Sequence, residues 1–200
     1  MDFENRLKGT VTQTLVKALL EDAGYRTIAL GVEEVIREVS VLDRGEYRDL
    51  ALPTVLKRMP DFFVADSDLS KAWLLEVKYR KQWNAKTRES LGKQIREQVK
   101  IWHPLFLTVF LGNSTKPGND SPIHSIGVIR LECENEKMFF VRRNGRNKKG
   151  TPVAWSDVEW SDFSRFQDVF EGVGDRWKDQ TIMQTLDILR TLNGADLFEE

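Results

Sequence analysis

The chain is organised around residues 59–81, which read MPDFFVADSDLSKAWLLEVKYRK. Two apolar runs in this stretch, DFFVA and AWLLEV, are joined by the polar turn Asp66-Ser67-Asp68. Aromatic residues, Val and Leu bounded by turn residues are typical of β-strands. If residues 72–79 form a strand, Glu76 and Lys78 project from one face, because side chains alternate between faces. A turn that returns the chain beside Asp61 would then bring two carboxylates and an amine together.

This predicted group has a functional and a structural interpretation. Carboxylates are suitable oxygen ligands for a hard divalent cation. A lysine beside them can position a water molecule or stabilise charge on a phosphate. Alternatively, Glu76 and Lys78 form a solvated ion pair, and Pro60-Asp61 only begins a turn. The apolar run around Glu76 and Lys78 favours the functional interpretation, because burying both charges is costly unless something binds them.

Length and composition narrow the class of protein. The chain has 200 residues, enough for one domain, and a net charge of −1, which says nothing about its partners. Cys133 is the only cysteine, so no intramolecular disulfide forms, in keeping with a reducing cytosol. His103, His124 and Cys133 lack zinc-ligand spacing, and no Walker-type or dinucleotide-binding glycine loop is present. The N-terminus has no signal-peptide pattern and no apolar run is long enough for a membrane span, so we expect a soluble, cytoplasmic protein.

Periodicity along the chain predicts an α/β fold, with helices flanking a mixed central β-sheet. Residues 105–111 form a continuous apolar run, as expected of a parallel strand buried on both faces. We expect a single domain with a core of about residues 1–145 and a C-terminal helical extension of about 155–194. Strands are predicted at residues 25–30, 61–65, 72–79, 105–111, 125–132 and 137–142, and helices at 3–23, 49–57, 87–102, 162–170 and 175–192.

Positive charge is concentrated directly after the central stretch. Between positions 78 and 100 there are eight Lys or Arg residues against two Glu. The predicted helix at 87–102 has the core stripe Leu91, Ile95, Val99 and Trp102, with Gln94 and Gln98 flanking it and Lys93 and Arg96 toward solvent. Such a helix beside an acidic group suits a surface that binds a polyanion, although an ordinary solvated face remains the alternative. The basic run 142–150 is either a phosphate-contacting loop or a solvated turn.

These motifs resemble the PD-(D/E)xK nuclease superfamily. Pro60-Asp61 is followed by Glu76-Val77-Lys78 on the next strand and by a basic helix carrying Gln94, and LLEVKYRK is similar to the restriction-endonuclease-like and Holliday-junction-resolvase-like branches. Upstream, the segment from Lys8-Gly9 to residues 23–25 resembles the first helix of resolvase-like members. In those members a glutamate four residues after the glycine completes the metal site. Here that position is Gln13, a poorer cation ligand. The match covers roughly residues 8–111, with an unmatched insertion at about 32–58.

The resemblance implies a restriction-endonuclease-like core and a Mg²⁺- or Mn²⁺-dependent endonuclease that acts on DNA. Asp61 and Glu76 would bind the metal together with the Val77 carbonyl, and Gln13 would be a weak or indirect ligand. Lys78 would orient or deprotonate the attacking water, and Gln94 would touch the edge of the site or a substrate phosphate. A homodimer would supply two sites for cutting two strands. The residues expected to contact DNA are Arg80, Lys81, Lys86, Arg88, Lys93, Arg96, Arg142 and Arg143.

Two other functions are compatible with the same residues. The first is a catalytically inactive nuclease-fold module that binds nucleic acid or a protein partner without cutting, which the neutral Gln13 favours. The second is a structural domain in which Glu76 and Lys78 form a buried ion pair. This last alternative predicts that removing Lys78 alone destabilises the fold, because an unpaired buried acid is left behind.

Overall fold

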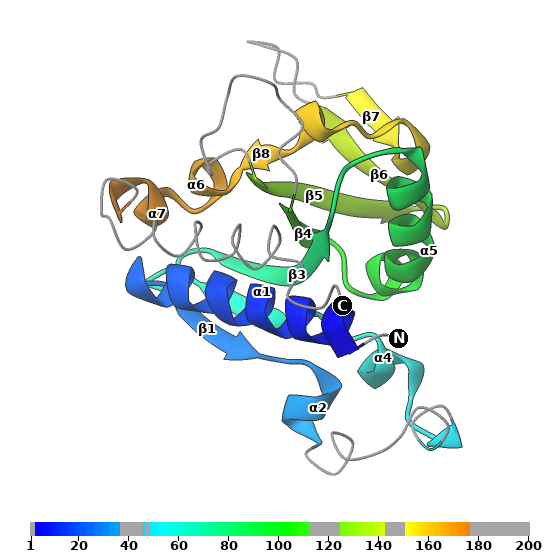
Figure 1. Ribbon diagram of the computed structural model, residues 1–200, viewed down its shortest axis with the longest axis horizontal. Coiled ribbons are helices and arrows are strands. Elements are labelled where there is room, and N and C mark those ends of the chain that lie inside the picture. The colour runs from blue at the N-terminus through cyan, green and yellow to red at the C-terminus, as the bar shows by residue number, and fades with distance from the viewer. Residues whose placement is uncertain (1–2, 37–45, 47–48, 113–124, 143–150, 177–200) are drawn as a thin grey trace, which may run out of the picture.

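A computed structural model describes residues 3–36, 46, 49–112, 125–142 and 151–176 of the chain (Figure 1). These residues contain an eight-stranded sheet with the strand order β1-β2-β3-β4-β5-β6-β7, and β8 pairs with β5 off this path. The β3–β4 pair is parallel and the other pairs are antiparallel. The strands are β1 (Arg26–Ala29), β2 (Phe62–Ala65), β3 (Ala72–Arg80), β4 (Leu105–Leu111), β5 (Ile126–Glu134), β6 (Lys137–Arg142), β7 (Thr151–Ala154) and β8 (Ser164–Arg165). The predicted mixed α/β class is therefore confirmed.

Two long helices cover the sheet, α1 (Phe3–Asp22) and α5 (Ala85–Ile101), and they lie on different sides of β3 (Figure 1). No helix in the described ranges has the length and apolar character needed to cross a membrane. The shorter helices are α2 (Val32–Val35), α4 (Thr54–Lys57), α6 (Phe166–Val169) and α7 (Glu171–Arg176), with 3₁₀ turns η3 (Trp155–Asp157) and η4 (Trp160–Asp162).

The end of α1 and the start of α5 are each marked by a local signal. The chain leaves α1 through Gly24, whose φ of 86° favours glycine because a Cβ is strained there. The side chain of Asn84 caps α5 by accepting a hydrogen bond from the backbone N–H of Thr87 at 2.9 Å. These two signals set where α1 ends and where α5 begins.

Each face of the sheet has its own hydrophobic core. Under α1, Val16 and Leu20 pack with Leu75 and Val77 of β3. On the other face, Leu74 of β3 packs against the core under α5, which consists of Leu91, Ile95, Val99 and residues of β4, β5, β6 and η3. Trp102, expected in the stripe of α5, is instead its half-buried C-cap. Because side chains alternate along β3, Glu76 and Lys78 face α5, opposite to the residues that contact α1.

The helix predicted for residues 162–170 is wrong. Residues Ser164–Arg165 form β8 and pair with Gly127 and Val128 of β5, so only Phe166–Val169 is helical. Backbone pairing with a distant strand thus overrode the helix that the local spacing of aromatic residues predicted. Those aromatics are nevertheless core: Phe166 and Phe170 pack under α1, while Phe163 packs on the α5 side.

Several further predictions differ in extent from the structure. The helix expected at 49–57 is interrupted: residue 49 is helical, and α4 begins only after Pro53, which stands at its N-cap. The C-terminal extension is not helical throughout, since it contributes β8 to the sheet, and β7, which was not predicted, pairs with β6. The helix predicted at 175–192 lies outside the described residues from position 177 onward.

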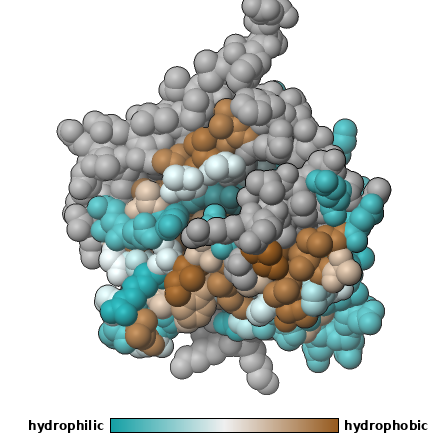
Figure 2. All heavy atoms as spheres, turned by 90° about the horizontal axis from the view of Figure 1, so that it is seen from below, coloured by the Kyte–Doolittle hydropathy of each residue, from teal (hydrophilic) through white to brown (hydrophobic). Residues whose placement is uncertain are grey.

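Apolar side chains on the surface are spread over several elements. Figure 2 shows brown apolar groups between teal polar ones on the face seen from below. The large exposed ones in the described ranges are Leu7, Ile28, Val55, Leu69, Ile101 and Val141. Single surface hydrophobics of this kind are ordinary in folded proteins.

Candidate active site

Asp61 is positioned by the pairing of β2 with β3. Phe62 is opposite Leu75 in this antiparallel pair, so Asp61, one residue earlier, lies across from Glu76. The backbone N–H of Val77 donates to Oδ2 of Asp61 at 2.7 Å. The backbone carbonyl of Asp61 accepts from the N–H of Leu30 at 2.9 Å. The carboxylate is thus held directly before the start of β2, where the sequence predicted that it would meet β3.

Lys78 joins the two carboxylates. Its Nζ forms an ion pair with Oε1 of Glu76 and lies 3.9 Å from Oδ2 of Asp61. The side chains of Lys78 and Asp61 are 25% and 17% exposed, while that of Glu76 is 7% exposed. Solvent therefore reaches the lysine and one carboxylate, and the other carboxylate forms the buried side of the site.

The sequence did not identify Gln98 as the amide that reaches the acids. Gln98 is buried, and its Nε2 donates to Oε2 of Glu76 at 2.7 Å and to the backbone carbonyl of Met59 at 3.2 Å. Gln94, the predicted residue, is exposed, and its Oε1 accepts from Nη2 of Arg80 at 2.7 Å. The two glutamines are one helical turn apart on the same flank of α5. The sequence therefore showed that both glutamines lie on one flank of the helix. It did not show which of the two lies beside Glu76.

Burial and charge set the protonation of this cluster. Burial raises the pKa of Glu76, and the neighbouring Asp61 raises it further, against the opposing effect of the Lys78 ammonium. For Lys78, burial by itself lowers the pKa, but the carboxylates of Glu76 and Asp61 together outweigh it and raise the pKa. Two acids thus share one ammonium, which leaves an excess of negative charge when both are ionised. A divalent cation would compensate that charge.

The donor set fits a hard cation. The N–H of Val77 points toward Asp61, and in an antiparallel pair the N–H and carbonyl of one residue point to the same neighbour. The Val77 carbonyl therefore faces the side on which Asp61 lies, and it adds a third oxygen to the two carboxylates. Within the described ranges no group of three or more His, Cys, Asp or Glu side chains gathers, so the carbonyl and water would complete the coordination.

Gln13, the predicted weak metal ligand, has no hydrogen bond to the acid cluster in the described residues. It is half-buried on α1, which packs on the face of β3 that carries Leu75 and Val77.

The eight residues predicted to contact DNA differ in their surroundings. Lys81, Lys86 and Arg96 are exposed, whereas three others are engaged within the protein: Nη1 of Arg80 donates to the Tyr79 carbonyl, Nη1 of Arg88 donates to the Val158 carbonyl, and Lys93 pairs with Glu89. Arg142 ends β6, and Arg143 lies outside the described residues.

Comparison of the chain with protein-family models, curated proteins and solved structures gave no match. The chemistry open to the site follows from its own groups. Two carboxylates and a carbonyl can hold a cation, and a protonated lysine beside them can hold a water molecule or an anionic oxygen.

Proposed function

We propose that this protein is a Mg²⁺- or Mn²⁺-dependent endonuclease that hydrolyses phosphodiester bonds of DNA. The observation that carries the proposal is the position of the Lys78 ammonium between Asp61 and Glu76, at a point that solvent reaches. Asp61 directly precedes β2, and Glu76 lies on the antiparallel neighbour β3, in the order expected from the resemblance to PD-(D/E)xK nucleases. A purely structural ion pair would need one acid and one base, and the second acid supports a role in binding a cation.

Each residue has a distinct role in the proposed reaction. Asp61, Glu76 and the Val77 carbonyl would hold the divalent cation, which supplies Lewis-acid polarisation of a phosphate when bound. Lys78 remains protonated at neutral pH. Burial lowers its pKa, but the two carboxylates raise the pKa by more. It therefore donates hydrogen bonds from Nζ, holding the attacking water in place and stabilising negative charge on the phosphate oxygens.

Gln98 is a positioning residue in this scheme. Lys78 contacts Oε1 of Glu76, and Gln98 donates to Oε2. Both carboxylate oxygens are therefore engaged, and the carboxylate plane has one orientation. The hydrogen bond from Gln98 also lowers the pKa of Glu76, against the larger effect of burial, and so favours the ionised form that binds a cation.

The experiment is titration of Mn²⁺ by calorimetry, with plasmid nicking assayed on the same samples. Wild type, Asp61→Ala and the control Asp68→Ala are compared. Asp68 is an exposed acid in the β2–β3 turn that accepts a hydrogen bond from the N–H of Ser70, so its loss should leave both readouts unchanged. We expect Asp61→Ala to lose Mn²⁺ binding and nicking together. Mn²⁺ binding without nicking of any DNA form would favour a module that binds without cutting. No Mn²⁺ binding by wild type would refute the proposal.

A further inference from the structure

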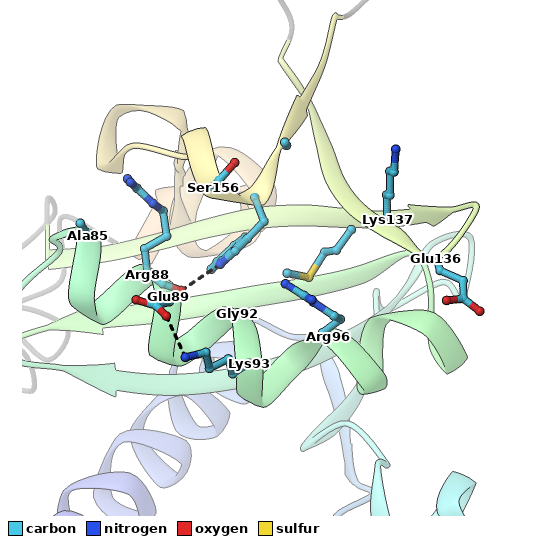
Figure 3. Close-up of a pocket in the computed structure, with 12 residues that line it drawn as sticks. Ala85, Arg88, Glu89, Gly92, Lys93, Arg96, Glu136, Lys137 and Ser156 are labelled. Carbon is cyan, nitrogen blue, oxygen red and sulfur yellow. Dashed lines mark hydrogen bonds and ion pairs between the residues drawn. The ribbon is translucent and has the colours of Figure 1, made fainter.

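A concave surface lies on α5, bounded by the tip of the β5–β6 hairpin and by η3 (Figure 3). It is an open groove of about 610 Å³. Its walls come from residues that are far apart in the chain: Arg88 and Arg96 on α5, Lys137 on the hairpin, and Trp155 in η3. None of the acid-cluster residues lines it. The groove is therefore a separate feature of the described residues.

The floor of the groove is closed and rigid. Gly92 allows the indole of Trp155 to approach α5, since a Cβ at this position would lie 2.3 Å from Nε1. The indole N–H donates to the Arg88 carbonyl at 2.9 Å (Figure 3), and Trp155 is only 6% exposed. The tryptophan thus presents no open ring on which a base could stack. Contacts in this groove must come from its charged rim.

The rim carries more positive than negative charge. Its cationic side chains are Arg88, Lys93, Arg96 and Lys137, and its acids are Glu89 and Glu136, an excess of two positive charges. Both acids have cationic neighbours within the protein: Glu89 pairs with Lys93 at 2.7 Å, and Glu136 lies 3.8 Å from Nζ of Lys100. The exposed side chains of Arg96 and Lys137 come from opposite walls of the groove (Figure 3). An anionic occupant of the groove would therefore meet a rim with an excess of positive charge.

The groove lies on the other flank of α5 from the acid cluster. Arg96 is two residues from both Gln94 and Gln98, and at 3.6 residues per turn it points about 160° away from each of them. Gln98 contacts Glu76, so Arg96 projects from the far side of the helix. The separation of groove and acids is on the order of one helix diameter, roughly 10 Å.

We propose that this groove binds the sugar–phosphate backbone of the DNA at a second place, one helix width from the point of cleavage. The inference rests on the proposed function, since it names where the same substrate is held. Arg96 and Lys137 contact phosphates, and the sealed floor excludes base stacking, so binding is independent of sequence. The groove therefore contributes affinity and orientation, while the acid cluster performs the chemistry.

The test measures the affinity of a fluorescein-labelled DNA duplex by anisotropy over a series of salt concentrations. EDTA is present, so that no cleavage occurs. The variant Arg96→Glu/Lys137→Glu is compared with the control Arg26→Glu/Lys71→Glu, which makes the same change of charge at two exposed positions, one on β1 and one in the β2–β3 turn. Arg96→Ala/Lys137→Ala removes both charges without adding any, and thermal melting of each variant verifies the fold.

We expect the groove variant to bind DNA at least about tenfold more weakly than wild type, and the control to bind within about threefold. In the alanine variant the slope of log K against log salt should fall by about two, one for each lost phosphate contact. Equal affinities for the groove and control variants would overturn the proposal. So would competition by polyglutamate as effective as by DNA of equal charge, because the groove would then suit an acidic protein segment.

The test separates this inference from the proposed function. Cleavage by wild type in Mn²⁺, combined with unchanged DNA binding by Arg96→Glu/Lys137→Glu, would refute DNA binding by the groove. The nuclease proposal would be unaffected. Salt-dependent DNA binding that requires Arg96 and Lys137, without cleavage of any DNA form, would overturn the nuclease proposal while the groove remained a backbone-binding site.

Discussion

Replacement of Lys78 by Met tests whether this lysine is catalytic or structural. Met keeps a long apolar stem but removes the ammonium, which pairs with Glu76 and lies 3.9 Å from Oδ2 of Asp61. If the cluster is a metal site, the ammonium competes with the cation for the same carboxylates. Its removal should then slow cleavage strongly while metal binding is kept. If Lys78 only neutralises a buried acid, its removal should chiefly lower the stability of the fold.

The geometry of the cluster gives the expected size of the change in Mn²⁺ affinity and in cleavage rate. Two unit charges 3.9 Å apart interact by about 4 kcal/mol at an effective dielectric constant of about 20. Because Lys78 and Asp61 are 25% and 17% exposed, we reduce this to about 1–2 kcal/mol. Lys78→Met should therefore bind Mn²⁺ about tenfold more tightly than wild type does. Loss of charge stabilisation at the phosphate should lower the cleavage rate by about 10²–10³-fold.

Calorimetric titration of Mn²⁺ and a single-turnover nicking assay on the same protein measure both quantities, with Asp61→Ala as the variant that should lose both. Urea denaturation in EDTA tests the structural alternative, for which breaking a buried ion pair costs about 3–5 kcal/mol. Nicking by Lys78→Met at the wild-type rate would refute a catalytic lysine. Loss of Mn²⁺ binding together with a large loss of stability would show that Lys78 is part of the scaffold.

Three further predictions test the site and its supports. Gln98→Leu removes a hydrogen bond that lowers the pKa of Glu76, so the acid limb of the pH profile of nicking should move to higher pH, whereas Gln94→Leu should leave it in place. Gly92→Ala should lower the free energy of unfolding in urea by about 1–3 kcal/mol, since the added Cβ would meet an indole ring. Gly9→Ala in α1, with nothing within 4 Å, should raise it by about 0.5–1 kcal/mol. Because burial raises the pKa of Glu76 in the folded state, its contribution to stability is greatest in acid and is lost as pH rises through that pKa. Mg²⁺ binds the ionised acid, so it should raise the melting temperature more at pH 8 than at pH 5. An equal rise at both pH values would contradict this assignment.

Local sequence patterns determined much of the fold. The runs on either side of the 66–68 turn gave β2 and β3, and apolar spacing gave α1 and α5, because these patterns depend on neighbours within a few residues. The same locality placed Asp61, Glu76 and Lys78 together, since a short turn and strand alternation fix their relative positions. What the sequence determined, therefore, was the secondary structure around the acid cluster and the identity of its charged members.

The tertiary structure decided what depends on distant contacts. It placed Gln98, and not Gln94, against Glu76. The position of α5 along its own axis, relative to β3, determines which turn of the helix lies beside the acid. It turned residues 164–165 into β8, since β5 offered backbone hydrogen-bonding partners that no local pattern shows. It also placed Arg96 of α5 and Lys137 of the β5–β6 hairpin on the rim of one groove. Each of these outcomes depends on packing between segments far apart in the chain, and such packing leaves no periodic signal in the sequence of either segment.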